Sequence, residues 1–307
     1  MNKDIVNAII YKCLGYKKGE RLLIVCDDGL RDLAYDFYVK TKAAGIESML
    51  LQMNPRKIHG DEVPKAVAGA MNSVDIALLF TSVSMSHTKA RNEACKIYGT
   101  RIASMPGITE TVMRRAILID YSRLYKKAKY ISDLLTKGKR LEIYTARGTY
   151  LSMSISTRKG YMDNGLYIEK GAFGNLPAGE ACVAPMEGTT NGRLVVDGSN
   201  PLTGMVKRPI EIQINNGFAE EIPIRAAKGL MGRLGKCVLN VAELGIGLNP
   251  KAKVTGNVLE DEKALNTAHI AFGNNISFGG KVDCRCHLDF VFNKPKIYID
   301  GVMLPIN

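Results

Sequence analysis

The sequence predicts an α/β protein, with an N-terminal open, parallel-type α/β domain followed by a β-rich (α+β) domain. The chain has 307 residues, about twice the usual size of one domain. Up to about residue 120, buried-strand patterns alternate with helical ones, whereas after residue 137 strands follow one another with Gly, Asn and Asp between them. The boundary is expected between residues 120 and 140, so we assign 1–130 to the first domain and 131–307 to the second.

The first domain is expected to open with an amphipathic helix over residues 2–14, where the apolar side chains share one stripe. Apolar runs then predict strands, and helical patterns predict a helix after each of them. The expected strands are 20–28, 47–53, 75–80 and 101–105, and the expected helices are 30–45, 62–71, 87–99 and 109–117. This alternation indicates parallel βαβ units with helices on both faces of the sheet. A helix over 121–136 is expected to connect the domains.

In the second domain, alternating patterns predict strands over 140–146, 149–155, 193–198 and 210–217, and helical periodicity persists mainly at 225–236. These strands are expected to form a strongly curved antiparallel or mixed sheet. The chain contains no Walker A sequence, and the glycines of 243–249 do not form the GxGxxG pattern. A dinucleotide site of the Rossmann type is therefore not expected.

The composition is that of a globular protein, with 46% hydrophobic and 23% charged residues. Apolar runs such as 78–80 with their flanks are too short to span a bilayer, and the N-terminus lacks the apolar segment of a signal peptide. We therefore expect a cytoplasmic protein with no membrane partner. The seven cysteines include no CxxC pair and are expected to be reduced thiols.

The chain carries 42 basic and 30 acidic residues, a net charge of +12. The basic excess is spread along the sequence, and no nucleic-acid-binding module is recognisable. A solvated basic surface is the simpler interpretation, so no nucleic-acid partner is expected. A small anionic substrate is the alternative explanation of the basic excess.

The most informative segment for chemistry is 281–292, KVDCRCHLDFVF. If it is a strand, alternate side chains share a face, which puts His287 and Asp289 together on the polar side. Cys284 and Cys286 then point into the core as small hydrophobes. An imidazole and a carboxylate that converge in this way suit a divalent metal ion, although an isolated pair is more often an ordinary solvated polar face.

Three further segments of the second domain supply candidate ligands. His269 lies among small neighbours on its face of 267–273, which leaves room beside the imidazole, although it could be a satisfied core histidine. Glu243 closes a strand, 238–245, that is apolar on both faces, so its carboxylate needs a metal ion or a basic partner. Glu180 ends a Gly/Pro turn that can hold a side chain rigidly. Glu187 has a weaker claim and could simply order the 188–192 turn, and 260–263 is expected to be a helix start or a solvated loop.

Together these segments offer five nitrogen or oxygen ligands, more than one zinc ion usually takes. They suit a two-metal site with one bridging ligand. Because no thiolate is involved, Zn²⁺, Mn²⁺, Co²⁺ and Fe²⁺ are all compatible with the set.

Four ordered motifs, GNLPAGEACVAPMEGTTNG, AELGIGLNP, LEDEKALNTAHIAFG and HLDF, resemble the M29 family of metallo-aminopeptidases, the aminopeptidase T group. The resemblance implies a homodimer whose β-rich domain carries a dinuclear metal site. Matched by motif, the family's ligands fall on the five residues already singled out: Glu180, Glu243, His269, His287 and Asp289. The sequence departs from the family in two ways. It is shorter, and it lacks the family's catalytic tyrosine, since nothing between His269 and His287 is Tyr.

The leading hypothesis is therefore a metal-dependent aminopeptidase that releases N-terminal residues of peptides. Two divalent ions per chain, Zn²⁺, Co²⁺ or Mn²⁺, would activate a water, and Glu180 or Glu243 would also relay a proton as the catalytic residues. The α/β domain would shape the substrate cleft. The alternative is ring opening of a non-peptide small molecule, as in 2,5-dihydroxypyridine dioxygenase, a relative of the same fold that uses one Fe(II) and O₂ and resembles the HxD part of the pattern. A basic nucleic-acid-binding or partner-binding protein is the third hypothesis, and net charge is its only support.

Overall fold

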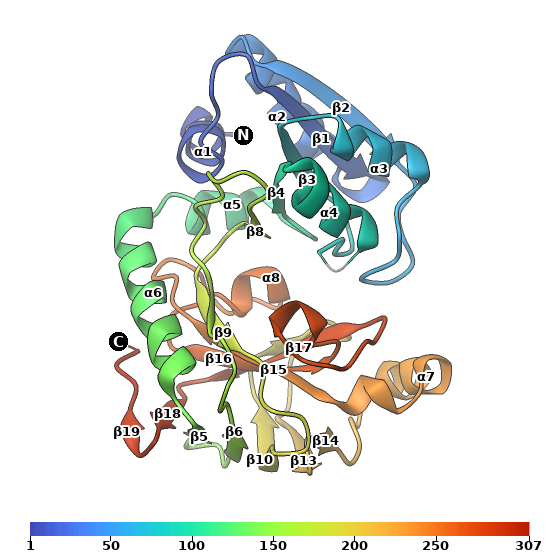
Figure 1. Cartoon of the computed structure of the whole chain (residues 1–307). Helices are drawn as coiled ribbons and strands as arrows, with labels where there is room; N and C mark the ends of the chain where they lie inside the picture. Colours follow the sequence, from blue (N-terminus) through green and yellow to red (C-terminus); the bar gives the residue numbers. More distant parts are fainter. Residues whose placement is uncertain (87, 307) are drawn as a thin grey trace. The chain divides into compact units, whose positions relative to one another are not determined.

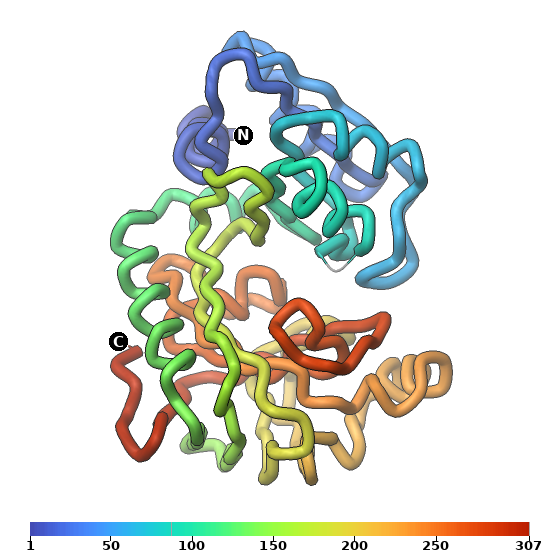
Figure 2. The backbone as a smooth tube through the Cα atoms, viewed as in Figure 1, coloured from blue at the N-terminus to red at the C-terminus, as the bar shows by residue number. Residues whose placement is uncertain are grey.

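The computed structural model describes residues 1–86 and 88–306, and Figure 2 follows the backbone through them. The chain forms two compact units. The first unit holds Met1–Tyr121 and Gly165–Ala178, and the second holds Ser122–Asn164 and the chain from Gly179 onward. This division differs from a single boundary at residue 130 for two reasons. Helix α6, Tyr121–Lys137, lies almost wholly in the second unit, and the segment 165–178 returns to add a strand to the first.

The first unit is built on a five-stranded parallel sheet (Figure 1). Its strands, in spatial order, are β2 (Glu47–Met53), β1 (Arg21–Asp27), β3 (Ile76–Phe80), β4 (Arg101–Ser104) and β8 (Phe173–Asn175). The predicted open parallel α/β architecture is confirmed. Strand β8 was not predicted, because its three residues lie in a Gly-rich stretch and become a strand only by pairing with β4, far away in the sequence.

The helices of the first unit follow the predicted alternation. They are α1 (Lys3–Asn7), which continues into a π-helical segment (Ala8–Cys13), α2 (Arg31–Ala43), α3 (Lys65–Asn72), α4 (Lys89–Glu93), which continues into a second π-helical segment (Ala94–Tyr98), and α5 (Glu110–Ala116). A single 3₁₀ turn, Asp28–Leu30, links β1 to α2. Residue 87, the first of the helix predicted over 87–99, lies outside the described residues.

Both faces of this parallel sheet are covered. On one face, Leu23 and Val25 of β1 belong to the same buried cluster as Met71 of α3. On the other, the rings of Phe37 in α2 and Phe80 in β3 lie 5.6 Å apart, and both are fully buried. Successive strand side chains alternate between the two faces, so the continuous apolar runs of β1 and β3 are explained by burial on both sides.

The second unit contains two larger antiparallel sheets (Figure 1). The first, with seven strands, is ordered β14 (Phe218–Ala219), β13 (Ile210–Asn215), β10 (Asn191–Val196), β6 (Tyr150–Ser154), β5 (Arg140–Tyr144), β18 (Lys296–Ile299) and β19 (Val302–Met303). A small hairpin pairs β11 (Ser199–Asn200) with β12 (Gly204–Met205). Besides α6, the helical segments are α7 (Arg225–Leu234), a 3₁₀ turn (Lys236–Leu239) and α8 (Val258–Asp261).

The second antiparallel sheet has five strands: β17 (His287–Asn293), β16 (Thr267–Gly273), β15 (Val241–Gly247), β9 (Glu180–Val183) and β7 (Tyr161–Asp163). Every residue of β15 and β16 is buried, so these central strands form the core of the sheet. The strand predicted over 238–245 begins only at Val241, because the preceding residues form the 3₁₀ turn.

The strand predicted over 281–292 also begins late, at His287. Residues 281–286 form a loop, which backbone and side-chain hydrogen bonds tie to Asn274 and Asn275. The amide group of Asn275 accepts a hydrogen bond from the backbone N–H of Val282 at 2.8 Å, and Asn274 donates to the carbonyl of Cys284 at 3.0 Å. The expected pairing of His287 with Asp289 on one face survives, because both residues lie inside β17.

The expectation of seven reduced thiols is wrong at two positions, since Cys237 and Cys284 form a disulfide. The two cysteines are 47 residues apart in sequence, and spacing alone gave no sign that the 236–239 turn and the 281–286 loop lie side by side. The remaining cysteines are buried thiols outside this disulfide. No helix in the part of the chain that the structure describes is long and apolar enough to cross a membrane.

Candidate metal centre

Five polar side chains converge on one face of the five-stranded sheet. They come from four neighbouring strands: Glu180 from β9, Glu243 from β15, His269 from β16, and His287 and Asp289 from β17. Ala271 of β16 lies opposite both Glu243 and Asp289, and residues paired across antiparallel strands point to the same face. The structure thus brings together all five residues singled out from the sequence. Their role as metal ligands stays a prediction.

His287 faces two carboxylates. Its Nε2 atom lies 3.0 Å from Oε2 of Glu243 and 3.2 Å from Oδ1 of Asp289. Its Nδ1 atom lies 2.8 Å from the backbone carbonyl oxygen of Asn274, which can only accept, so Nδ1 carries a proton. The remaining nitrogen, Nε2, can then hold either a second proton or a cation placed among the three groups.

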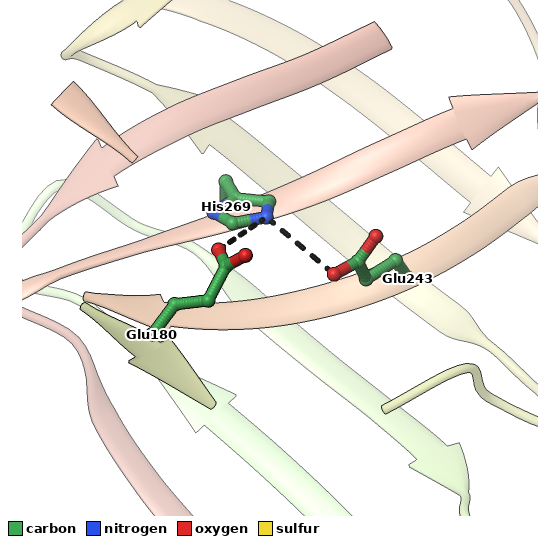
Figure 3. Close-up of side chains that lie close together, drawn as sticks. All are labelled: Glu180, Glu243 and His269. Atoms are coloured by element: carbon green, nitrogen blue, oxygen red, sulfur yellow. Dashed lines mark ion pairs between the residues drawn. The ribbon is translucent and has the colours of Figure 1, made fainter. Parts of the chain in front are cut away.

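His269 lies at the centre of the cluster. Figure 3 shows the carboxylates of Glu180 and Glu243 turned toward its ring. Its Nε2 atom lies 3.8 Å from Oε2 of Glu180, 3.9 Å from Oε1 of Glu243 and 3.8 Å from Oδ1 of Asp289. These separations are too long for hydrogen bonds, so three oxygens surround the nitrogen without bonding to it. Such an arrangement leaves a place for an ion that His269, Glu180 and Glu243 could hold together.

Gly245 makes room for the central imidazole. It lies opposite His269 in the register of β15 and β16. A Cβ atom at this position would lie 2.1 Å from Cε1 and 2.3 Å from Nε2 of His269. The ring therefore lies against the bare backbone of β15, and any side chain at residue 245 would push it out of the cluster.

The cluster is charged in spite of its burial. Burial disfavours the carboxylate of Glu243, but the hydrogen bond and charge of His287 outweigh it and hold the pKa of Glu243 below its ordinary value of 4.5. Burial likewise disfavours the imidazolium of His287, but Asp289 and Glu243 raise the pKa of this ring well above 6.5. The carboxylate of Glu243 is therefore ionised at neutral pH, and it favours a cation beside it.

Cys182, two residues after Glu180 on β9, contributes no thiolate to this set. Burial, reinforced by the negative charge of Glu243, raises the pKa of its thiol well above 9.0. The protonated thiol hydrogen-bonds to Glu243. The available ligands are therefore nitrogen and oxygen atoms only, as the sequence predicts.

A buried lysine that the sequence analysis did not single out lies beside the cluster. The Nζ atom of Lys263 lies 2.6 Å from Oε1 of Glu180 and 2.8 Å from Oε1 of Glu262, and it is 3.7 Å from Oδ2 of Asp163. Burial disfavours the ammonium, but the three carboxylates outweigh it and raise the pKa of Lys263 well above 10.5. Burial raises the pKa of Glu262 well above 4.5, an effect that Lys263 only partly offsets.

The segment 260–263 is therefore not the solvated loop expected as one interpretation. Its first two residues do belong to a short helix, α8, but all four are buried. Asp261 accepts hydrogen bonds from the backbone N–H groups of Thr255 at 2.7 Å and Gly256 at 2.8 Å, so its charge holds a neighbouring turn. The apolar residues on both sides of the segment, 258–259 and 264–265, were the available signal for burial.

Glu187 orders a different loop from the one expected. Its Oε1 atom accepts from the Asn275 side chain at 3.0 Å and from the backbone N–H of Lys281 at 2.8 Å. Arg158 pairs with the other carboxylate oxygen and donates to the carbonyl of Gly279. Glu187 thus fixes the ends of the 275–281 loop, which reaches the rim of the cluster through Phe278.

Two aromatic rings follow one another beside His287. The ring of Phe278 lies 5.5 Å from the imidazole of His287, and the ring of Tyr161, on β7, lies 6.0 Å from that of Phe278. Phe278 occupies the segment in which the sequence lacks a tyrosine. Tyr161 belongs to a three-residue strand with no recognisable pattern, so nothing in the sequence pointed to it.

The donor set fits a divalent metal ion. The Oε2 atom of Glu180 is buried and has no hydrogen-bond partner among residues 1–86 and 88–306, although it points into the cluster. Three sets of potential ligand atoms lie within 4.8 Å of one another: Glu180, Glu243 and His269; Glu243, His287 and Asp289; and Glu262, His269 and Asp289. Imidazole and carboxylate ligands together suit Fe²⁺, Mn²⁺, Co²⁺ or Zn²⁺.

Comparisons with known proteins place this geometry in a family context. The family model for 2,5-dihydroxypyridine 5,6-dioxygenase (NicX) matches residues 34–305. The solved structure of 2,5-dihydroxypyridine dioxygenase from Pseudomonas putida KT2440 has a TM-score of 0.82 and 16% identity, over 99% of this chain and 98% of that one. Wild-type AmpT from Thermus thermophilus has a TM-score of 0.69 and 15% identity, over 99% and 96%. A search of the curated proteins found no matching sequence.

These matches confirm the fold that the expected resemblance implied, but they do not confirm the M29 peptidase family. At 15% identity the likeness to AmpT shows a shared fold, and membership of the M29 peptidase family is not confirmed by the sequence. The sequence match covers most of the chain and is to a dioxygenase family. The chain belongs to the 2,5-dihydroxypyridine 5,6-dioxygenase (NicX) family.

Proposed function

We propose that this chain is a metal-dependent dioxygenase that opens the ring of a dihydroxylated nitrogen heteroaromatic, with 2,5-dihydroxypyridine as the first candidate substrate. One observation carries the proposal. The Nε2 atoms of His269 and His287 lie 3.8 Å and 3.2 Å from the same oxygen, Oδ1 of Asp289. Two imidazoles and one carboxylate are the ligand set of non-haem Fe(II) oxygenases. The family match supports the same reaction class.

In this proposal His269, His287 and Asp289 hold the ion, and Glu243 lies beside them. Fe(II) in such a site supplies the one-electron chemistry by which O₂ reacts with an electron-rich ring. The chain's own residues orient the ligands. The Asn274 carbonyl fixes the tautomer of His287, and the bare backbone of Gly245 lets the ring of His269 enter the cluster.

The surrounding side chains also suit an aromatic diol. Glu180 keeps one carboxylate oxygen without a partner in the described part of the chain, so it can accept a proton from a substrate hydroxyl. The rings of Phe278 and Tyr161 offer apolar faces near His287, against which a planar heteroaromatic can pack. The ionised carboxylate of Glu243 favours the neutral or cationic form of the pyridine ring.

The test is oxygen uptake by the chain after anaerobic reconstitution with Fe(II). With 2,5-dihydroxypyridine we expect one O₂ consumed per substrate molecule, together with loss of the ring's ultraviolet absorbance. The Zn²⁺-loaded chain and His287→Ala serve as controls and are expected to be inactive. Loss of the ring without O₂ consumption, or no reaction with any dihydroxypyridine isomer, would contradict the proposal.

Aminopeptidase activity is the second candidate. The observation that favours it is that Glu180 and Glu243 join the three other residues, which makes five potential ligands on one face, on a fold shared with AmpT. This activity would persist without oxygen and with Zn²⁺, Co²⁺ or Mn²⁺. Anaerobic release of N-terminal residues from peptides by the Co²⁺-loaded chain, lost in Glu180→Gln, would establish it in place of the dioxygenase.

A further inference from the structure

Lys263 is a buried cation beside the candidate metal ligands. Its side chain is 1% exposed, so water cannot solvate the ammonium. Instead Nζ lies 2.6 Å from Glu180, 2.8 Å from Glu262 and 3.7 Å from Asp163. A buried ammonium is tolerated only with such partners, and the carboxylates in turn need a cation. This part of the cluster is therefore already neutralised by the protein itself.

Glu180 connects the lysine to the candidate metal ligands. Its Oε1 atom bonds to Lys263, while its Oε2 atom, which lacks a hydrogen-bond partner in the described ranges, lies 3.8 Å from Nε2 of His269. A carboxylate that bridges two metal ions uses both of its oxygens, one for each ion. Here the ammonium already takes one oxygen of Glu180, so only the other is directed at the ligands.

The ligands that remain suffice for a single ion. Glu243, His269, His287 and Asp289 provide two nitrogens and up to four oxygens, away from the direct contacts of Lys263. A second divalent ion held by Glu180, Glu243 and His269 would share the carboxylate of Glu180 with the ammonium, whose Nζ atom lies 2.6 Å from Oε1. Two cations that share one carboxylate in a buried site repel each other strongly.

We propose that the ammonium of Lys263 stands where a second divalent ion would bind, and so limits this chain to one metal ion. The inference rests on the metal site of the proposed function but not on its reaction. Lys263 acts here as a positioning residue, because it holds Glu180 in place and excludes an ion without itself reaching the substrate. Replacing it by a neutral side chain is expected to convert a one-ion site into a two-ion site.

The experiment counts bound Mn²⁺ per chain by equilibrium dialysis and elemental analysis, with no oxygen or heteroaromatic substrate present. The unaltered chain is expected to bind one ion tightly. Lys263→Met is expected to bind two, with the magnetic coupling of neighbouring Mn²⁺ ions in its electron paramagnetic resonance spectrum. Lys263→Arg keeps the charge and is expected to bind one, which makes it the matched control.

Two ions in the unaltered chain, or one uncoupled ion in Lys263→Met, would overturn the inference. Lys263→Met leaves the carboxylates of Glu180, Glu262 and Asp163 without their lysine, and the loss can prevent folding. In that case added Mn²⁺ is expected to restore folding, measured by circular dichroism, since a divalent ion can neutralise the same carboxylates. Failure to fold with and without Mn²⁺ would also count against it. If the oxygen-uptake assay fails while these ion counts hold, the reaction is wrong and the role of Lys263 stands.

Discussion

The two ends of the cluster neutralise buried carboxylates in different ways. At the histidine end, Glu243 and Asp289 face Nε2 of His287, at 3.0 Å and 3.2 Å. At the lysine end, Glu262 and Asp163 face the ammonium of Lys263, at 2.8 Å and 3.7 Å. Both ends lie in the second unit and are largely buried.

The difference lies in what each end can release. An imidazole nitrogen can give up its proton and become a metal ligand, whereas a lysine amine among three carboxylates keeps its proton. The histidine end can therefore exchange a proton for a metal ion, and the lysine end holds a permanent cation. A count of acidic residues alone would treat the two ends as equivalent.

The largest expected effect separates the two ends directly. His287→Ala removes a nitrogen ligand and is expected to weaken the binding of Mn²⁺ or Fe²⁺ by more than about 100-fold. This loss exceeds the one expected when a residue that only hydrogen-bonds to a metal ligand is replaced. Lys263→Arg, the matched change at the lysine end, is expected to leave the affinity within about tenfold. Isothermal titration of both variants measures this. Equal losses at the two ends would show that the comparison is wrong.

A smaller effect is expected at Gly245, which lies opposite the central His269. In Gly245→Ala the new Cβ would collide with the imidazole, 2.1 Å from Cε1. We expect metal affinity to fall about tenfold and the free energy of unfolding to fall by about 2 kcal/mol, since the ring must move out of a packed position.

The control for this variant is Gly232→Ala on α7, where an added Cβ meets nothing within 4 Å. It is expected to leave metal binding unchanged and to stabilise the helix by about 0.5–1 kcal/mol. Calorimetric unfolding and metal titration of both variants measure the difference. Unchanged metal affinity in Gly245→Ala would mean that His269 does not bind the ion.

The smallest effect concerns the loop beside the histidine end. Burial disfavours the carboxylate of Glu187, but hydrogen bonds with its own backbone, with the backbone of Lys281 and with Asn275, together with the charge of Arg158, outweigh burial and lower its pKa below 4.5. A lowered pKa in the folded chain stabilises it above pH 4.5, and this stabilisation is lost as the pH falls through the folded-state value. Glu187→Gln is expected to reduce the free energy of unfolding by about 1 kcal/mol near pH 7.

Urea unfolding of the metal-free chain, with and without this substitution, tests the sign. The gap between the two proteins should shrink as the pH falls below 4.5, because the unfolded chain then takes up a proton that the folded chain binds less readily. A gap that widens toward acid would refute the assignment of a charged Glu187 to the loop. Metal must be absent, since bound ions would stabilise the folded state by themselves.

The parts of the site that the sequence could predict share a physical cause. His269, Glu243 and the pair His287 and Asp289 lie on strands with clear alternation or burial, so a polar side chain stands out against an apolar pattern. The alternating βαβ pattern of the first unit was predictable for the same reason. Periodicity reports the local environment of a strand or helix, and those environments are regular.

The parts that sequence reasoning missed depend on contacts between distant segments. From the sequence, Lys263 is expected on the surface, since lysine is rarely buried. Its buried position is explained only by Glu180 on β9 and Asp163 on β7, which are distant in the sequence. Tyr161 lies on a strand of three residues, too short for a pattern. The Cys237–Cys284 disulfide likewise follows from the path of the chain and not from spacing.

The most direct test of the central claim is the number of Fe(II) ions bound per chain, counted after anaerobic reconstitution of the unaltered protein and removal of excess iron. One tightly bound ion per chain is the predicted result, because His269, His287 and Asp289 hold that ion and the ammonium of Lys263 already takes one oxygen of Glu180. Two tightly bound ions per chain would contradict the account, and would show that the lysine end also takes a metal.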